Sequence, residues 1–386
     1  MNLRFFITSY VVVAFTGAFS LSGQDLLTSH TDIFFSYDET TGEWSGGLRH
    51  GGTSDNPTLE TPFGQASLPL RDQLINAGDR LVATSFDSFT GAVSGEPFWE
   101  LPQVNQGYTW PGFRNAVTPN LFRSYQLNDS RQTATQRWVT YSLQDVIYSG
   151  QSTQTPHFAA YQFDSFGALK LWMSTVDDID QSDVYYLDEN GHAHLNFSFN
   201  ALGIFRVGFR ASGILDSDGS TVTSQTEYVT FAVGTLATWL ADHYGGADLT
   251  NSLISGMDAD AEGDGVNIRS EYAFNLNPTI KDRHYLERDT GTSGLPIGWL
   301  AESSGATRLH LQMVCRKPET NPQIEYCVEF NDDLSDPAGW VTAAATTTTS
   351  IDDTWERVTV IDSESISSKA NRFARVRVLV QETITY

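Results

Sequence analysis

Two histidines separated by a single residue, His192 and His194, are the first residues whose type and spacing suggest chemistry. They belong to the run 191–199, in which polar and apolar residues alternate. On a β-strand both imidazoles therefore lie on one face, about 7 Å apart. The run 204–209 repeats the alternation, and we expect the two runs to form a hairpin with one apolar face in a core. The polar face of this hairpin is the first candidate site.

Other metal-binding side chains occur in the same part of the chain. His30 and Asp32 alternate in the strand-like run 30–37, and His157 begins another such run, 157–163. Imidazole nitrogens together with a carboxylate oxygen suit Zn²⁺, Mn²⁺ or Cu²⁺. The alternative is that these histidines only hydrogen-bond to carboxylates and backbone groups. The predicted ligands of a transition metal such as Zn²⁺ are His30, Asp32, His157, His192 and His194.

An acidic stretch, residues 258–265, offers a second kind of metal site. From Asp260 onward the sequence has the spacing Asp-x-Glu-x-Asp-Gly-x5-Glu, which places carboxylates at positions 1, 3, 5 and 12 of an EF-hand-type loop. Ca²⁺ needs hard oxygen atoms that converge from such a tight turn. The alternative is a solvated acidic linker. The predicted calcium ligands are Asp260, Glu262, Asp264, the carbonyl of Val266, and Glu271.

The elements that must position these residues are mainly β-strands. Short alternating runs separated by turn residues predict a first β-sandwich of immunoglobulin-like or jelly-roll type over residues 24–235. These runs are 30–37, 81–89, 97–101, 138–146, 157–163, 168–174 and 227–233. Residues 99–113, rich in aromatic residues and proline, predict a loop.

Helical spacing replaces alternation at residues 236–244 and again at 266–274, on either side of the acidic stretch. We therefore expect residues 236–282 to form a helical linker that carries the calcium loop. Strand-like runs return in the last hundred residues and predict a small second β-sandwich over residues 283–386. These runs are 308–314, 324–330, 355–361 and 372–380.

The first 23 residues have the features of an export signal: one positive charge, an apolar stretch, and small residues before Gln24. No later segment is long and apolar enough to cross a membrane, so the mature chain is expected to lack a transmembrane segment. A net charge of −24 over 386 residues excludes nucleic acid as an expected partner. Export also permits a disulfide between Cys315 and Cys327, although strand alternation would require a bulge to join them.

Six motifs occur in order over about 210 residues, at 29–32, 98–103, 108–113, 138–143, 191–197 and 230–234. Together they resemble the choice-of-anchor M domain, also described as an actinobacterial surface-anchored protein domain. The resemblance implies a cell-surface protein, and a cell-envelope component or metal-uptake system as its partner. Residues 113–116 read Phe-Arg-Asn-Ala where the family usually has Trp-Asn-Thr-Glu, so any role of that glutamate is lost. Phe197 replaces a tryptophan that the family favours.

The later part of the chain resembles other secreted proteins. The acidic stretch is similar to dockerin-type or thrombospondin-type calcium loops, because Asn267 stands where an EF-hand has an apolar residue. Residues 325–334, followed by Trp340, are similar to C-terminal modules of secreted proteins from Verrucomicrobia-like bacteria.

We therefore expect a non-enzymatic exported binding protein, at the cell surface, in the periplasm or outside the cell. It would bind a transition metal in its first domain and carry a structural Ca²⁺. The sequence contains no Gly-x-Ser-x-Gly, phosphate-binding loop, Cys-x-x-Cys or His-Glu-x-x-His motif. The alternative is a secreted hydrolase that acts on polysaccharide, or a carbohydrate-binding protein.

Overall fold

The computed structural model of the chain describes residues 25–26, 29–52, 57–70, 74–75, 84–93, 98–126, 129, 131, 135–150, 152, 154–368 and 371–381. The predicted export signal lies outside them. The chain divides into two compact units, one of residues 23–251 and one of residues 252–380. Within the described residues, the helices are all too short or too polar to cross a bilayer.

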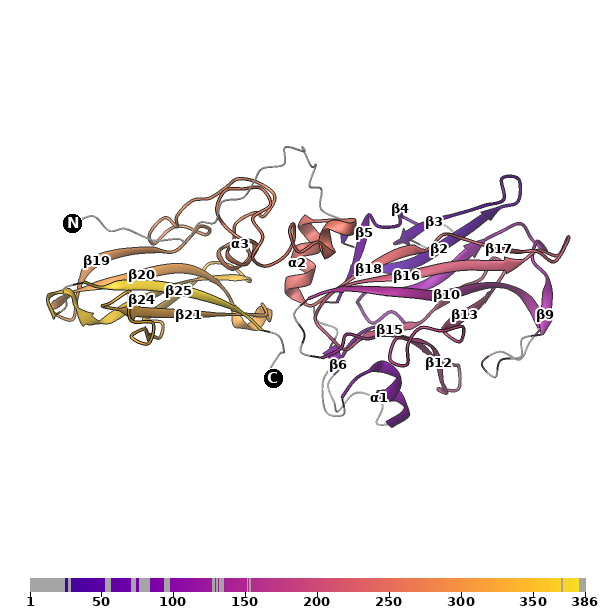
Figure 1. Ribbon diagram of the computed structural model, residues 1–386, viewed down its shortest axis with the longest axis horizontal. Coiled ribbons are helices and arrows are strands. Elements are labelled where there is room, and N and C mark those ends of the chain that lie inside the picture. The colour runs from indigo at the N-terminus through magenta and orange to yellow at the C-terminus, as the bar shows by residue number, and fades with distance from the viewer. Residues whose placement is uncertain are drawn as a thin grey trace. The chain divides into compact units, whose positions relative to one another are not determined.

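The first unit contains three sheets, and Figure 1 labels most of their strands. The largest has the order β1-β5-β18-β16-β10-β13, with β17 beside β16 and β9 beside β10. Its strands are β1 (Asp25–Leu26), β5 (Ala66–Pro69), β9 (Ser124–Gln126), β10 (Thr135–Ser149), β13 (Val184–Asp188), β16 (Gly203–Ile214), β17 (Thr221–Thr223) and β18 (Glu227–Val233).

The two other sheets each have five strands. The first has the order β12-β11-β15-β7-β6, with β6 (Leu74–Ile75), β7 (Phe98–Leu101), β11 (Phe158–Phe163), β12 (Leu169–Ser174) and β15 (Asn196–Phe199). The second has the order β14-β8-β2-β3-β4, with β2 (His30–Asp38), β3 (Glu43–His50), β4 (Leu59–Pro62), β8 (Trp110–Ala116) and β14 (His192–His194). The predicted mainly-β, sandwich-type fold is confirmed.

One apolar core joins the three sheets of the first unit. Alternation along β2 places Ile33 and Phe35 in this core, and Phe113 of β8 joins them there. The ring of Phe113 stacks on Tyr141 at 4.5 Å and meets Phe209 of the largest sheet at 5.3 Å. Because one face of β2 and β8 is used by the core, their alternate residues point to the opposite, outer face of the sheet.

The predicted hairpin of residues 191–199 and 204–209 is wrong. The first run divides between β14, which pairs with β8, and β15, which pairs with β11 and β7. The second run lies in β16, which pairs with β10 and β18. Phe199 and Phe205 still meet in the core, with ring centroids 4.9 Å apart, but they come from different sheets. Alternation continues unbroken through Leu195, so it gives no sign that the chain changes sheet there.

Two other local predictions also fail. Residues 84–89 of the run 81–89, which was predicted as a strand, belong to the helix α1 (Thr84–Thr90), and residues 81–83 lie outside the described residues. The proline-containing segment predicted as a loop forms β8 from Trp110 onward, between β2 and β14. The backbone nitrogen of Pro111 carries no hydrogen to donate, and Pro111 lies near the start of β8, where the loss of one ladder hydrogen bond is tolerated.

The first unit also includes the helix α2 (Thr235–His243) and the 3-10 helix η1 (Gly246–Thr250). The helix α3 (Ile268–Phe274) lies in the second unit. The side chain of Asn267 caps α3 by accepting a hydrogen bond from the Ser270 amide, and Asn275 ends the helix in the left-handed conformation. The helices predicted at residues 236–244 and 266–274 are confirmed as α2 and α3.

The second unit is a smaller pair of sheets, of four and three strands. Their orders are β19-β20-β24-β23 and β22-β21-β25. The strands are β19 (Ile297–Ser303), β20 (Ala306–Arg316), β21 (Ile324–Asn331), β22 (Val341–Thr342), β23 (Thr347–Ser350), β24 (Trp355–Ser365) and β25 (Phe373–Val380), with the 3-10 helices η2 (Pro318–Thr320) and η3 (Ile366–Ser368).

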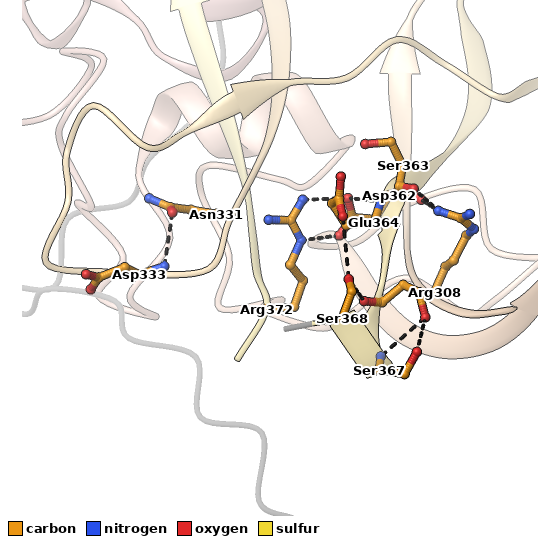
Figure 2. Close-up of polar contacts among 10 residues, drawn as sticks. Arg308, Asn331, Asp333, Asp362, Ser363, Glu364, Ser367, Ser368 and Arg372 are labelled. Carbon is orange, nitrogen blue, oxygen red and sulfur yellow. Dashed lines mark hydrogen bonds and ion pairs between the residues drawn. The ribbon is translucent and has the colours of Figure 1, made fainter. Parts of the chain in front are cut away.

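A buried ion pair connects the two sheets of the second unit (Figure 2). Arg372, just before β25, donates through Nε and through Nη2 (2.6 Å) to the two carboxylate oxygens of Asp362 in β24. Arg308 of β20 donates to the backbone carbonyl oxygens of Asp362 (3.2 Å) and Ser363. Because the side chain of Asp362 is only 1% exposed, this bidentate pairing provides the opposite charge that the buried carboxylate requires.

The disulfide that export would permit is not formed: Cys315 and Cys327 are both free thiols. Cys315 lies in β20, which pairs with β19 and β24, whereas Cys327 lies in β21, which pairs with β22 and β25. β21 is the next strand after β20 along the chain, but the two strands belong to different sheets. Cys315 is buried, and burial raises the pKa of its thiol.

The buried carboxyl group of Glu100 in β7 is expected to make the protein less stable as the pH rises. Burial raises the pKa of Glu100 to about 8, so the folded state keeps a proton that the unfolded state releases above about pH 4.5. Stability contributed by this proton is present at pH 4.5 and is lost as the pH rises to about 8. Glu100→Gln is expected to melt about 2–6 °C above wild type at pH 8.5 and at the same temperature at pH 4.5, by calorimetry. A constant difference between the two proteins at all pH values would contradict this.

Candidate metal sites

The first candidate site lies on the outer face of the sheet β14-β8-β2. In the pairing of β8 with β2, Trp110 lies opposite His30 and Gly112 opposite Asp32. In the pairing of β8 with β14, Gly112 also lies opposite His194. Three neighbouring strands thus bring together residues about 160 positions apart in the sequence.

Four of the five residues predicted as transition-metal ligands meet there, each offering one ligand atom within 4.8 Å of the others: His30, Asp32, His192 and His194. His30 Nε2 lies 3.2 Å from His194 Nε2, 3.4 Å from His192 Nε2 and 3.4 Å from Asp32 Oδ1. His192 Nε2 lies 2.8 Å from Asp32 Oδ1. A tetrahedral Zn²⁺ with bonds of about 2.0–2.1 Å has its ligand atoms about 3.3 Å apart. Four of the six distances among these atoms are therefore close to the spacing of a tetrahedral zinc site.

The protonation states of this cluster suit metal binding. Burial is the main cause that lowers the pKa of His194, to about 4, and burial also lowers the pKa of His30. Burial alone would raise the pKa of Asp32, but the hydrogen bond from His192 and the nearby histidine charges lower it overall. At neutral pH, His30 and His194 are therefore neutral and Asp32 is ionised, which are the ligand forms. The second oxygen of Asp32, Oδ2, is buried and accepts no hydrogen bond from the described residues.

Gly112 makes room for the cluster. It lies between Asp32 and His194 on the same face of the sheet, and it has no side chain. A Cβ atom at this position would stand 2.8 Å from His194 Nδ1 and 2.4 Å from the carbonyl oxygen of Ala193. Beside it, the indole of Trp110 packs against the imidazole of His30 with ring centroids 5.7 Å apart. The strand between the ligands therefore leaves space that the imidazole of His194 uses.

His157 does not join the cluster. It precedes β11 in a different sheet, and its Nδ1 contacts the carbonyl oxygen (3.2 Å) and the hydroxyl (3.3 Å) of Thr175. Its imidazole also fills the space beside Gly91. These contacts give His157 a structural role, because they fix the segment before β11 against the end of β12.

His50, which was not among the predicted ligands, lies at the end of β3 next to β2. His50 Nδ1 is 3.1 Å from the Thr31 hydroxyl, directly opposite it in the pairing of β3 with β2. Thr31 alternates with Asp32, so His50 lies on the opposite face of the sheet from the cluster. His50 is therefore a neighbour of the site and not a member of it.

The acidic loop is folded around Asp260. The carboxylate of Asp260 accepts hydrogen bonds from the amides of Gly263 (2.9 Å), Asp264 (3.1 Å) and Gly265 (3.0 Å). Gly263 and Gly265 have φ values of 75° and 88°, a conformation that favours glycine. The Val266 amide donates to Asp264 Oδ1 at 2.8 Å, and its side chain is buried. The role of the Val266 carbonyl as a ligand stays a prediction.

The carboxylates near this loop form two overlapping groups that could hold a metal ion. One is Asp260, Glu262 and Asp264, and the other is Asp264, Glu271 and Asp282. Asp282 was not predicted, because it lies eleven positions beyond the end of the loop motif at Glu271. Both carboxylate oxygens of Glu262 and of Glu271, and Oδ1 of Asp282, are buried and accept no hydrogen bond from the described residues. Burial and the neighbouring carboxylates raise the pKa of Glu262 to about 7 and that of Glu271 to about 9. A bound cation would satisfy these oxygens.

Comparison of the chain with known protein families and with curated proteins finds no match to either. A function for the chain is therefore inferred from the geometry of the two candidate sites.

Proposed function

We propose that this protein is an exported, non-enzymatic metal-binding protein whose first unit holds a transition metal, Zn²⁺ best of all. Its ligands are Nε2 of the three histidines and the carboxylate of Asp32. The single observation that carries the proposal is the close approach of four ligand atoms on β2 and β14, the strands on either side of β8, with four of their distances between 2.8 and 3.4 Å. In the metal-free protein, the contact of His192 with Asp32 needs a proton on Nε2, and the metal would replace that proton.

The ligand set also supports a binding role over catalysis. Catalytic zinc sites usually have three protein ligands and leave a fourth position open for water, whereas structural sites use four protein ligands. Here four protein groups converge, and three of them are imidazole nitrogens, which suit Zn²⁺ better than Ca²⁺ or Mg²⁺. The side chain of His192 is 27% exposed, so the metal would lie close to solvent.

The second unit is proposed to bind Ca²⁺ at the acidic loop, in a structural role. Its buried carboxylate oxygens without hydrogen-bond partners support this proposal. Export to the cell surface or beyond, and association with a cell-envelope component or a metal-uptake system, follow from the sequence features and the family resemblance alone. They belong to the same proposal.

Removal of two imidazoles tests the transition-metal site. The double variant His192→Ala/His194→Ala is expected to lose bound metal, because two ligands remain of four. Wild-type and variant proteins would be loaded with Zn²⁺, dialysed, and analysed for metal content by mass spectrometry. We expect about one equivalent for wild type and nearly none for the variant, beyond any metal at the acidic loop.

His50→Gln is the matched control, because His50 lies on the same sheet but on its opposite face. This variant is expected to retain the metal. A double variant that keeps the wild-type zinc content while remaining folded by circular dichroism would overturn the proposal.

A further inference from the structure

We propose that Asp282 is a ligand of the calcium ion, and that the ion joins three separate segments of the second unit. These segments are the acidic loop through Asp264, the helix α3 through Glu271, and the chain after the helix through Asp282. The inference rests on the proposed binding of Ca²⁺ and adds a ligand that the loop motif does not contain. One oxygen from each of the three residues lies within 4.8 Å of the other two.

Glu271 is the observation that points to an ion. Glu271 is fully buried on α3, and neither of its carboxylate oxygens accepts a hydrogen bond from the described residues. A buried carboxylate without a partner is costly, and this one has further carboxylates around it. Within the described residues, Glu262, Glu271 and Asp282 form no ion pair with lysine or arginine. The side chain of Arg283, the residue after Asp282, donates to the backbone carbonyl of Asp264 at 3.4 Å.

The backbone places Asp282 in the site. The amide of Arg283 donates to Asp264 Oδ2 at 2.8 Å, which fixes the segment after α3 against the acidic loop. Asp282 Oδ2 accepts a hydrogen bond from the Asn277 amide at 3.2 Å. Its other oxygen, Oδ1, is buried and accepts none. One oxygen therefore orients the side chain, and the other is available to coordinate the ion.

The ligand Glu271 also lies at the point where α3 attaches to the strands. The Tyr272 hydroxyl donates to the carbonyl of Pro322 (2.8 Å), and Arg316 Nε donates to the carbonyl of Tyr272 (2.9 Å). The Tyr326 hydroxyl donates to the carbonyl of Ala273 (2.7 Å). Calcium bound at Glu271 would therefore stabilise the docking of α3 on β20 and β21, and with it the second unit.

The test compares Asp282→Asn with Asp258→Asn in the full-length protein. Asp258 is the matched control: it belongs to the same acidic stretch, but its side chain is 81% exposed, pairs with Arg269 and is in neither ligand group. Calcium affinity would be measured by isothermal titration with CaCl₂, and protection of residues 268–274 by hydrogen exchange. We expect Asp282→Asn to bind Ca²⁺ about 10–100-fold more weakly and to lose the calcium-dependent protection of α3. Asp258→Asn is expected to match wild type.

The outcomes separate this inference from the proposal on which it rests. If wild type binds Ca²⁺ and Asp282→Asn binds it equally well, Asp282 is not a ligand and the inference is overturned, while calcium binding stands. If wild type does not bind Ca²⁺, both fail. A folding defect of the variant would be recognised without calcium, where Asp282→Asn is expected to melt no lower than wild type because it removes a negative charge from a carboxylate cluster.

Discussion

Gly112→Ala is expected to weaken Zn²⁺ binding about 10–100-fold, although position 112 contributes no ligand atom. The added Cβ would stand 2.4 Å from the Ala193 carbonyl oxygen and 2.8 Å from His194 Nδ1. The carbonyl oxygen is backbone and cannot rotate away, so β14 must shift relative to β8. His192 and His194 both lie on β14, and a shift of this strand moves two ligands at once. Competition titration with a chromophoric zinc chelator would measure the change in affinity.

Gly298→Ala provides the control for adding a methyl group to a strand glycine. Gly298 lies in β19 of the second unit, and a Cβ there would meet nothing closer than 3.5 Å. This variant is expected to bind Zn²⁺ as wild type does. If Gly112→Ala also binds Zn²⁺ with wild-type affinity, the ligands do not meet across β8 as described, and the proposed site loses its geometric support.

The membership of the cluster of His30, Asp32, His192 and His194 was largely predictable from the sequence, because alternation is a local property. It correctly placed His192 with His194, and His30 with Asp32, on one face of each strand. The pairing of strands is not local, however, so no pattern could show that β8 lies between β2 and β14. The steric role of Gly112 depends on that arrangement and therefore could not be predicted from the sequence.

Because strand pairing is not local, the sequence also led to wrong expectations for individual residues. His157 and the four residues of the cluster look alike in the sequence, since each lies in or beside an alternating run. The strand that follows His157, β11, however, belongs to a different sheet. Asn196 continues the alternation of His192 and His194, yet it is buried in β15, where it accepts a hydrogen bond from the Gln103 amide at 2.7 Å. Asp282 lies outside the loop motif and comes near Glu271 only through the turn after α3.

Glu271→Gln is expected to change the stability of the second unit in opposite directions with and without calcium. Without the ion, the folded state holds Glu271 with a pKa of about 9 and Glu262 with a pKa of about 7, both above the usual value of 4.5. The folded state then binds protons that the unfolded state has released. The stability that these protons contribute is fully present below about pH 4.5 and is lost as the pH rises toward 9. A glutamine at position 271 stays neutral at every pH, so the variant does not lose the stability that wild type loses when Glu271 ionises. The calcium-free variant is therefore expected to melt above calcium-free wild type at pH 8.

With Ca²⁺ present the order is expected to reverse, because the ion takes the place of the protons on the wild-type carboxylates. At a calcium concentration of about 100 times Kd, the ion contributes about 2.7 kcal/mol, or a rise in Tm of about 10 °C for a unit of this size. Wild type should show this rise at pH 8 and much less of it at pH 5, whereas Glu271→Gln should lose most of it at both. Calorimetry with CaCl₂ or with chelator, at both pH values, measures four melting temperatures for each protein. Glu325→Gln, at an exposed position in β21, serves as the control. A calcium-induced rise in Glu271→Gln equal to that of wild type would show that the ion does not bind at Glu271.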